Sequence, residues 1–192
     1  MQKKEIETFY PTSQHEWRTW LQENHVSKQA VWLVYYRIKS GVPTISWSDA
    51  VDEALCFGWI DSTKKSIDDE RFMQFFCKRK PTSVWSKINK SKVERLIQEE
   101  KFTKAGFNSV EVAKQNGSWL ILNEVEELNI PIDLEKAFKT QKGAKQFFLS
   151  LSKSTKKSIL QWLILAKRGK TRQNRCIEIA ELAAKNLKPK QF

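Results

Sequence analysis

Two stretches in the first third of the chain place apolar residues at helical spacing. Ser13 is followed three residues later by Glu16, a capping box that begins the first predicted helix, which ends near Asn24. The second predicted helix begins at Ser46 and ends at Gly58, because glycine commonly follows the last turn of a helix. Both helices have one apolar side, so we expect them to cover a sheet.

Three segments have the pattern of β-strands. Residues 30–38 are β-branched and aromatic on both faces, which predicts a strand at the centre of a sheet, buried on two sides. Residues 59–67 and 70–79 are predicted to form a hairpin with a two-residue turn at 68–69. Alternate residues of that hairpin share a face. One face then carries Ile60, Ser62, Lys64, Met73, Phe75, Cys77 and Arg79, and the other carries Trp59, Asp61, Phe72 and Phe76.

From Pro81 to its end the chain is predicted to be helical. Pro131 interrupts the pattern, so we place a domain boundary there, with a mixed part at 1–130 and a helical module at 131–192. Trp162 lies in a segment that is apolar nearly all round and is expected at the buried centre of that module. Five further helices are expected, with caps or stops at Ser83, Thr103, Gly117, Asp133, Ser154 and Thr171.

These patterns together predict an α+β fold. A small antiparallel sheet of about three strands is covered by helices and is followed by a C-terminal helical bundle.

Charge is distributed unevenly along the 192 residues. The formal net charge is +12, yet residues 71–93 hold seven Lys and Arg and residues 136–175 hold twelve, with no acid in either stretch. The remaining 15 Lys and Arg lie among all 22 Asp and Glu, so the rest of the chain is net −7. Such segregation indicates either a surface that meets an anionic partner or lysine-rich solvated faces.

Composition favours an intracellular protein. The three cysteines have unrelated spacings and no Cys-x-x-Cys pair, which is typical of a reducing compartment. The first residues are charged rather than apolar, so no secretory signal is expected. No apolar run approaches the roughly 20 residues that span a bilayer, so we expect no transmembrane segment and a cytoplasmic location.

Few residues suit enzyme chemistry. The two histidines, His15 and His25, have no companion at ligand spacing, and the six glycines are too dispersed for a phosphate-binding loop. No catalytic residue, metal site or cofactor is therefore expected. Cys56 shares a predicted helix face with carboxylates and Cys176 lies on an apolar stripe, so we expect both thiols to be unreactive.

Several separated blocks resemble the bacterial YdeI or OmpD-associated family, whose C-terminal module is called OmdA or bacteriocin-protection. The N-terminal blocks are ALCFGWIDS at 54–62, DER at 69–71 and RKPTSVWSKIN at 79–89. The tail matches at Phe147, Phe148, Leu151, Ser152, Ser154, Trp162, Ala166, Lys167, Thr171, Arg172 and Arg175. The resemblance implies protection against bacteriocins or antimicrobial peptides and a link to an outer-membrane porin, but no catalytic residues.

The segment after the last predicted strand is a candidate anion site. A helix expected to begin after Ser83 offers unpaired backbone N–H groups, and Arg79 and Lys80 arrive beside it. Asn89 falls on the apolar side of that helix, where a polar group must be paired or face a ligand. The candidate residues are Asp61, Lys64, Arg71, Arg79, Lys80, Ser83, Trp85, Ser86 and Asn89. The alternative is that they only cap, pack and pair.

Three functions are compatible with these patterns. The first is a non-catalytic binding or stress-protection protein whose basic surfaces engage an anionic ligand or an acidic protein partner. The second is a nucleic-acid-binding protein that uses the same surfaces, with Tyr36, Phe72, Phe75 and Phe76 either stacking on bases or forming the core. The third is an enzyme that acts on a small anionic substrate.

Overall fold

The computed structural model describes residues 6–192, which divide after Trp119 into two compact units. The first unit is mixed α and β and the second is all helical, so the predicted fold class is confirmed. The domain boundary at 130/131 remains a prediction, because compact packing alone does not define a folding domain.

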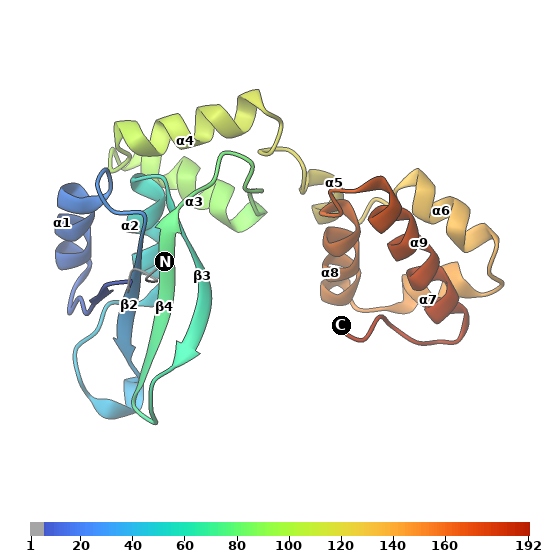
Figure 1. The fold of residues 1–192 in the computed structure, drawn as a ribbon, viewed down its shortest axis with the longest axis horizontal. Coiled ribbons are helices and arrows are strands. Elements are labelled where there is room, and N and C mark those ends of the chain that lie inside the picture. The colour runs from blue at the N-terminus through green and yellow to red at the C-terminus, as the bar shows by residue number, and fades with distance from the viewer. Residues whose placement is uncertain (1–5) are drawn as a thin grey trace, which may run out of the picture. The chain divides into compact units, whose positions relative to one another are not determined.

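The first unit is built on a four-stranded sheet with the order β1-β2-β4-β3. The strands are β1 (Thr8–Phe9), β2 (Ala30–Tyr36), β3 (Trp59–Ser66) and β4 (Arg71–Lys78), and β2 and β4 lie at the centre (Figure 1). The three predicted strands are present, and β4 pairs antiparallel with both β2 and β3. The short β1 pairs parallel with β2 and makes the sheet mixed. A strand of two residues is too short to show an alternation of apolar and polar positions, so the sequence does not predict β1.

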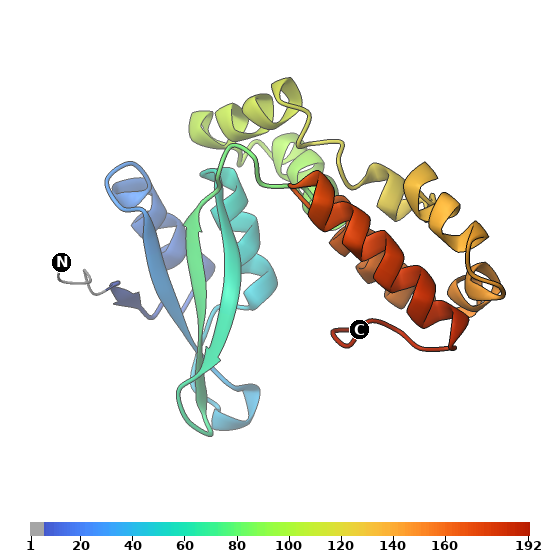
Figure 2. The ribbon, with the colours of Figure 1, turned by 45° about the vertical axis from the view of Figure 1, so that its right-hand side comes forward.

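Among the described residues of the first unit, helices cover one face of this sheet. The helices α1 (Gln14–Asn24) and α2 (Trp47–Cys56) lie on the same side of the strands (Figure 2). On β2, Val31, Leu33 and Tyr35 face them and are buried, whereas the alternate residues are half-buried. The prediction that this strand is buried on two faces was therefore wrong. The sequence suggested two buried faces because apolar residues also occupy the face that no helix covers.

The hairpin differs from its predicted register. Trp59–Asp61 pair with β4 as expected, but a bulge between Asp61 and Lys64 shifts the pairing by one residue. Because a one-residue shift reverses the faces, Lys64 pairs with Gln74 and contacts Phe72 instead of sharing the Met73 face. The connection is also longer than two residues, running from 67 to 70.

Buried ion pairs join the helices of the first unit. Glu53, which is 2% exposed, accepts from Arg18 of α1 at 2.6 Å. Its neighbour Asp52 pairs with Lys92 and Arg95 of α3 (Lys87–Gln98). Ion pairs therefore link the polar side of α2 to both α1 and α3. The helix α4 (Lys104–Gln115) packs against the C-terminal end of α2.

The helical unit contains α5 (Asn123–Glu126), α6 (Ile132–Lys139), α7 (Ala144–Ser150), α8 (Lys153–Ile164) and α9 (Gly169–Ala184). Thus seven helices follow Pro81 in the described chain rather than five. Thr103 caps α4 as predicted, but the N-caps of α3, α8 and α9 are Ser86, Ser152 and Arg168 rather than Ser83, Ser154 and Thr171, and α6 begins before Asp133. Neighbouring serines and threonines compete for these positions.

The core of the helical unit excludes the residue expected at its centre. Ile159, Leu160 and Leu163 of α8 are buried, while Trp162 is half-buried. Its ring contacts Phe192 near the end of the chain. Among the described residues of both units, no helix is long and apolar enough to cross a bilayer.

Candidate anion-binding site

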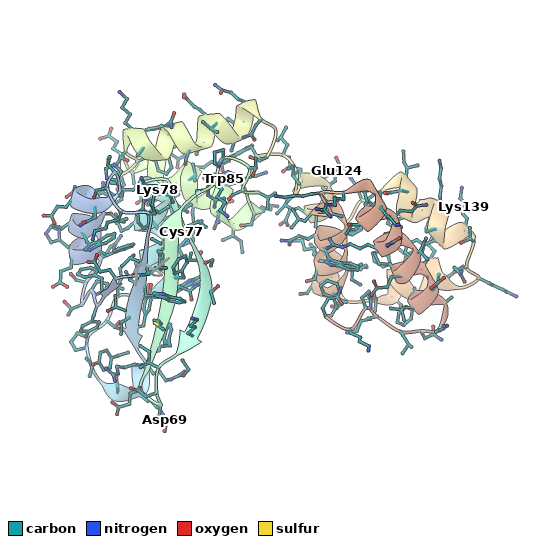
Figure 3. All side chains as sticks on the ribbon, viewed as in Figure 1. Asp69, Cys77, Lys78, Trp85, Glu124 and Lys139 are labelled. Atoms are coloured by element: carbon teal, nitrogen blue, oxygen red, sulfur yellow. The ribbon has the colours of Figure 1, made fainter. Side chains whose placement is uncertain are left out.

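Arg79 follows Lys78, the last residue of β4, and Lys78 and Trp85 are labelled in Figure 3. Its backbone N–H donates to the Gly58 carbonyl at 2.9 Å, which fixes it beside the beginning of β3. Its guanidinium donates from Nη1 to the Val84 carbonyl at 2.9 Å. The guanidinium carbon lies 3.6 Å from the centre of the Trp85 ring, a close cation–π contact.

No carboxylate forms an ion pair with Arg79 among the described residues. Burial lowers the pKa of its guanidinium to about 10, and the attraction of Asp61 opposes this shift only in part. The Arg79 side chain is half-buried as a whole, so part of its charge stays in contact with water, while the Val84 carbonyl and the Trp85 ring face the rest.

Three buried N–H donors in this region have no acceptor. They are Nε of Arg79 and the indole Nε1 atoms of Trp59 and Trp85. Both tryptophans are 1% exposed, and water is not free to reach these atoms. Buried donors are normally paired in proteins, so these three are exceptions; each atom has almost no accessible surface, and an acceptor could reach it only if neighbouring side chains moved.

A cavity of about 300 Å³ lies beside these residues. Its lining includes His25, Trp59, Lys78, Arg79, Lys80 and Asn108 and contains no acid. The walls also include apolar side chains, so the cavity suits an anion that carries an apolar part.

Gly58 sets the width of this cavity. Its φ is +71°, and an added Cβ would lie 3.0 Å from the Ala105 carbonyl oxygen of α4. Both the backbone conformation and the close packing therefore need glycine at this position.

The beginning of α3 is placed differently from the prediction. The helix begins at Lys87, and the Ser86 hydroxyl accepts from the Asn89 N–H at 3.2 Å. Ser83 lies in the preceding turn, where its N–H donates to the Lys80 carbonyl. The backbone donors expected just after Ser83 are therefore not those of a helix N-terminus. Arg79, Lys80 and Trp85 remain together.

The other predicted residues lie elsewhere. Asp61 accepts from the Trp47 indole at 3.0 Å and from Gln74 at 3.2 Å. Lys64 lies over the Phe72 ring, with Nζ 4.0 Å from its centre. Arg71 pairs with Asp68 beside the hairpin turn, whose tip is marked by Asp69 in Figure 3. The predicted constellation thus separates into an Arg79 group and residues with their own partners.

Sequence reasoning missed Trp59, Lys78 and Asn108 as parts of this site. Trp59 lies inside one of the family-like blocks, but the strand pattern around it does not show that its indole N–H lacks an acceptor. Asn108 comes from α4, and no local pattern shows that this helix packs beside Gly58.

The comparisons with known proteins identify two domains. Residues 9–109 match the family model described as Domain of unknown function (DUF8412), and residues 127–186 match the model described as Bacteriocin-protection, YdeI or OmpD-Associated (OmdA). No curated protein and no solved structure matches the chain significantly. The first match covers more than half of the chain and contains the sheet, whereas the second covers the helical unit from the end of α5 to the end of α9. The chain therefore belongs to the DUF8412 family and carries a C-terminal OmdA domain.

Proposed function

We propose that the protein is a non-catalytic binding protein that takes an anionic group, of a small ligand or of an acidic partner protein, at the Arg79 site. The observation that carries this proposal is the set of buried donors without acceptors at Arg79, Trp59 and Trp85. Arg79 and Trp59 line a cavity without acids, which favours an anion over a cation, and Trp85 stacks on Arg79 behind it.

The name of the OmdA family suggests a biological setting for this binding. The family is named for bacteriocin protection and for association with OmpD. A protective role would follow if the anionic group belonged to a partner that the protein holds or shields under stress. A porin partner would have to present a carboxylate or another anion to Arg79.

The affinity for a single anion is expected to be weak. Two or three charge-assisted hydrogen bonds, each contributing roughly 1.5–3 kcal/mol, have to offset the loss of translational freedom. A dissociation constant in the range of about 1 μM to 1 mM follows for one phosphate or carboxylate group. A larger acidic partner would add contacts outside the cavity.

Titration of the full chain by NMR tests this function. Phosphate, acetate and a short polyglutamate peptide are added at constant ionic strength while the Arg79 Nε–H and the indole N–H signals are followed. These signals should shift and saturate. Arg79→Met should weaken binding at least tenfold, the loss of one such bond. Arg175→Met is the matched control, since Arg175 also stacks on a tryptophan.

Two outcomes would contradict the proposal. The first is the absence of any shift at tens of millimolar of every probe. The second is an equal response in the Arg79→Met variant. Single-stranded nucleic acid should be tested in parallel, because a dissociation constant that rises steeply with salt would favour the nucleic-acid alternative.

A further inference from the structure

A second cavity, of about 550 Å³, lies where β2 ends and α2 begins. Four of its lining residues are aromatic: Tyr35, Tyr36, Trp47 and Phe72. Arg37 and Lys39 also line it, and no acid does. It shares no lining residue with the cavity at Arg79.

The aromatic walls are held in place by specific contacts. The rings of Tyr35 and Phe72 are stacked, with 5.0 Å between their centres and 3° between their planes. Trp47 is the first residue of α2 and is 52% exposed, yet its indole N–H donates to Asp61 at 3.0 Å. Gln74 in turn donates to Asp61, so a large exposed indole is fixed at the rim. Fixed, partly exposed rings provide a surface on which a planar group can stack.

The cations beside this cavity have no acid partners in the described chain. Arg37 donates to the neutral Ser66 hydroxyl at 3.2 Å, and Lys39 forms no ion pair. Lys64 lies with Nζ 4.0 Å from the centre of the Phe72 ring. Three cations therefore lie at the edge of an aromatic cavity, and the single Asp61 carboxylate that holds Trp47 offsets their field only in part, which favours an anionic group on the ligand.

One buried polar atom in this cavity also has no partner. Tyr35 is 1% exposed, and its hydroxyl forms no hydrogen bond among the described residues. A phenol O–H that is removed from water without a partner is costly, but this hydroxyl has almost no accessible surface, so a ligand in the cavity would reach it only if neighbouring side chains moved.

From these features we infer that the second cavity binds a planar aromatic ring that carries an anionic group. A nucleoside monophosphate and an aromatic carboxylate share this chemistry. The ring stacks on the exposed Trp47, and the anionic group meets Arg37, Lys39 and Lys64. Because the two cavities have no residue in common, this site stands or falls independently of the Arg79 site.

Calorimetry and NMR with the full chain separate the parts of this ligand. The probes are adenosine 5′-monophosphate, salicylate, adenosine and inorganic phosphate. Either of the first two should bind and shift the Trp47 indole N–H signal, whereas adenosine or phosphate alone should bind roughly tenfold more weakly because each lacks one of the two contacts. The preferred compound of the first pair distinguishes a nucleotide from an aromatic carboxylate.

The matched variants are Lys64→Ala and Lys65→Ala. Both lysines are exposed and lie over aromatic rings, but Lys64 contacts Phe72 at this cavity and Lys65 contacts Trp32 on the open face of the sheet. Lys64→Ala should weaken binding roughly threefold and Lys65→Ala should not change it. Tyr35→Phe should not lower stability and should leave binding unchanged, because it removes an unpaired hydroxyl that has almost no accessible surface.

Three results would overturn the inference. They are no binding of either aromatic anion at about 5 mM, equal binding of inorganic phosphate alone, and equal effects of the Lys64 and Lys65 substitutions. The last two would mean that charge alone attracts the ligand and that the aromatic cavity does not select it.

Discussion

Each unit contains an arginine stacked on a tryptophan, and the two pairs differ in burial. Arg79 lies over Trp85 at 3.6 Å and Arg175 lies over Trp162 at 4.5 Å, measured from the guanidinium carbon to the ring centre. Both guanidinium groups donate to a backbone carbonyl. Trp85 is buried and its indole N–H is unpaired, whereas Trp162 is half-buried. Stacking on a tryptophan is common to both arginines and does not by itself indicate a binding site. The Arg79 pair differs because its tryptophan is buried and the indole N–H has no acceptor.

The basic stretch of the helical unit shows how folding changes a linear pattern of charge. Lys145, Lys157 and Arg172 belong to the acid-free stretch at 136–175, yet each forms an ion pair with an acid that precedes it in the chain. These acids lie on α5 and α6. The surface of this unit is thus less segregated in charge than its sequence.

The largest difference between the two pairs should appear in stability. Trp85→Ala is expected to cost about 3–5 kcal/mol, the range for truncation of a buried large aromatic side chain. Trp162→Ala should cost about 1–2 kcal/mol, because part of its ring is already in water. Urea unfolding, followed by amide signals from each unit, measures both. If both substitutions lowered the free energy of unfolding equally, the two tryptophans would be equally buried in solution.

The buried cysteines should behave alike in the two units. Burial raises the pKa of Cys56 to about 12, with a contribution from Glu53, and that of Cys176 to about 11, with a contribution from Asp133. A thiol whose pKa is two or more units above normal has at most about one-hundredth of the usual thiolate at neutral pH. Both should resist a thiol reagent under native conditions, while the less buried Cys77 reacts first. Rapid native labelling of Cys56 or Cys176 would show local opening.

Several elements could be predicted because their signals are local. The caps Ser13, Ser46 and Thr103 were found from one side chain and one turn of sequence, and the structure confirms all three. The hairpin was predicted because an acidic turn separates a segment that begins with Trp59 and Ile60 from the aromatic strand that follows it. Each of these signals depends on residues close together in the chain.

Other features depend on contacts between distant segments. The bulge before Lys64 has no distinctive residue, yet it reverses the face of that lysine. Ser83 and Ser86 are both acceptable N-caps, and packing rather than propensity selects Ser86. No local pattern shows that the Trp59 indole lacks an acceptor, because that depends on the packing of distant segments. The sequence therefore placed Arg79, Lys80 and Trp85 among the candidates but not the other residues beside them, and the binding role stays a prediction.

The arginines should differ in their response to anions. Arg79→Met is expected to change the free energy of unfolding by less than about 1 kcal/mol in chloride buffer, because loss of stacking is offset by removal of an unpaired buried charge. Phosphate at fifty times its dissociation constant should stabilise the parent protein by about 2 kcal/mol. Arg79→Met should lose this increment and Arg175→Met should keep it. Urea midpoints with and without phosphate, at constant ionic strength, provide the measurement.

The smallest expected effect concerns Arg172, which forms an ion pair with Asp133. The hydrogen bond from Arg172 is the main cause that lowers the pKa of Asp133 in the folded protein. A carboxyl whose folded pKa is depressed stabilises the fold above its unfolded pKa of about 3.8, and this contribution is lost as the pH falls through the folded value. Because the pair is partly exposed, Asp133→Asn should cost only about 0.2–1 kcal/mol at pH 7.

The pH dependence distinguishes this ion pair from simple packing. The difference in unfolding free energy between the parent and Asp133→Asn should disappear below the folded pKa of Asp133, where the parent carboxyl is also neutral. Urea unfolding at pH 7 and at successively lower pH measures that difference. If it persists unchanged at low pH, the aspartate acts through its shape and its contact with Leu134 rather than through Arg172. Arg172 would then no longer serve as the example of an arginine stabilised by its carboxylate, to be compared with Arg79, which has no carboxylate partner among the described residues.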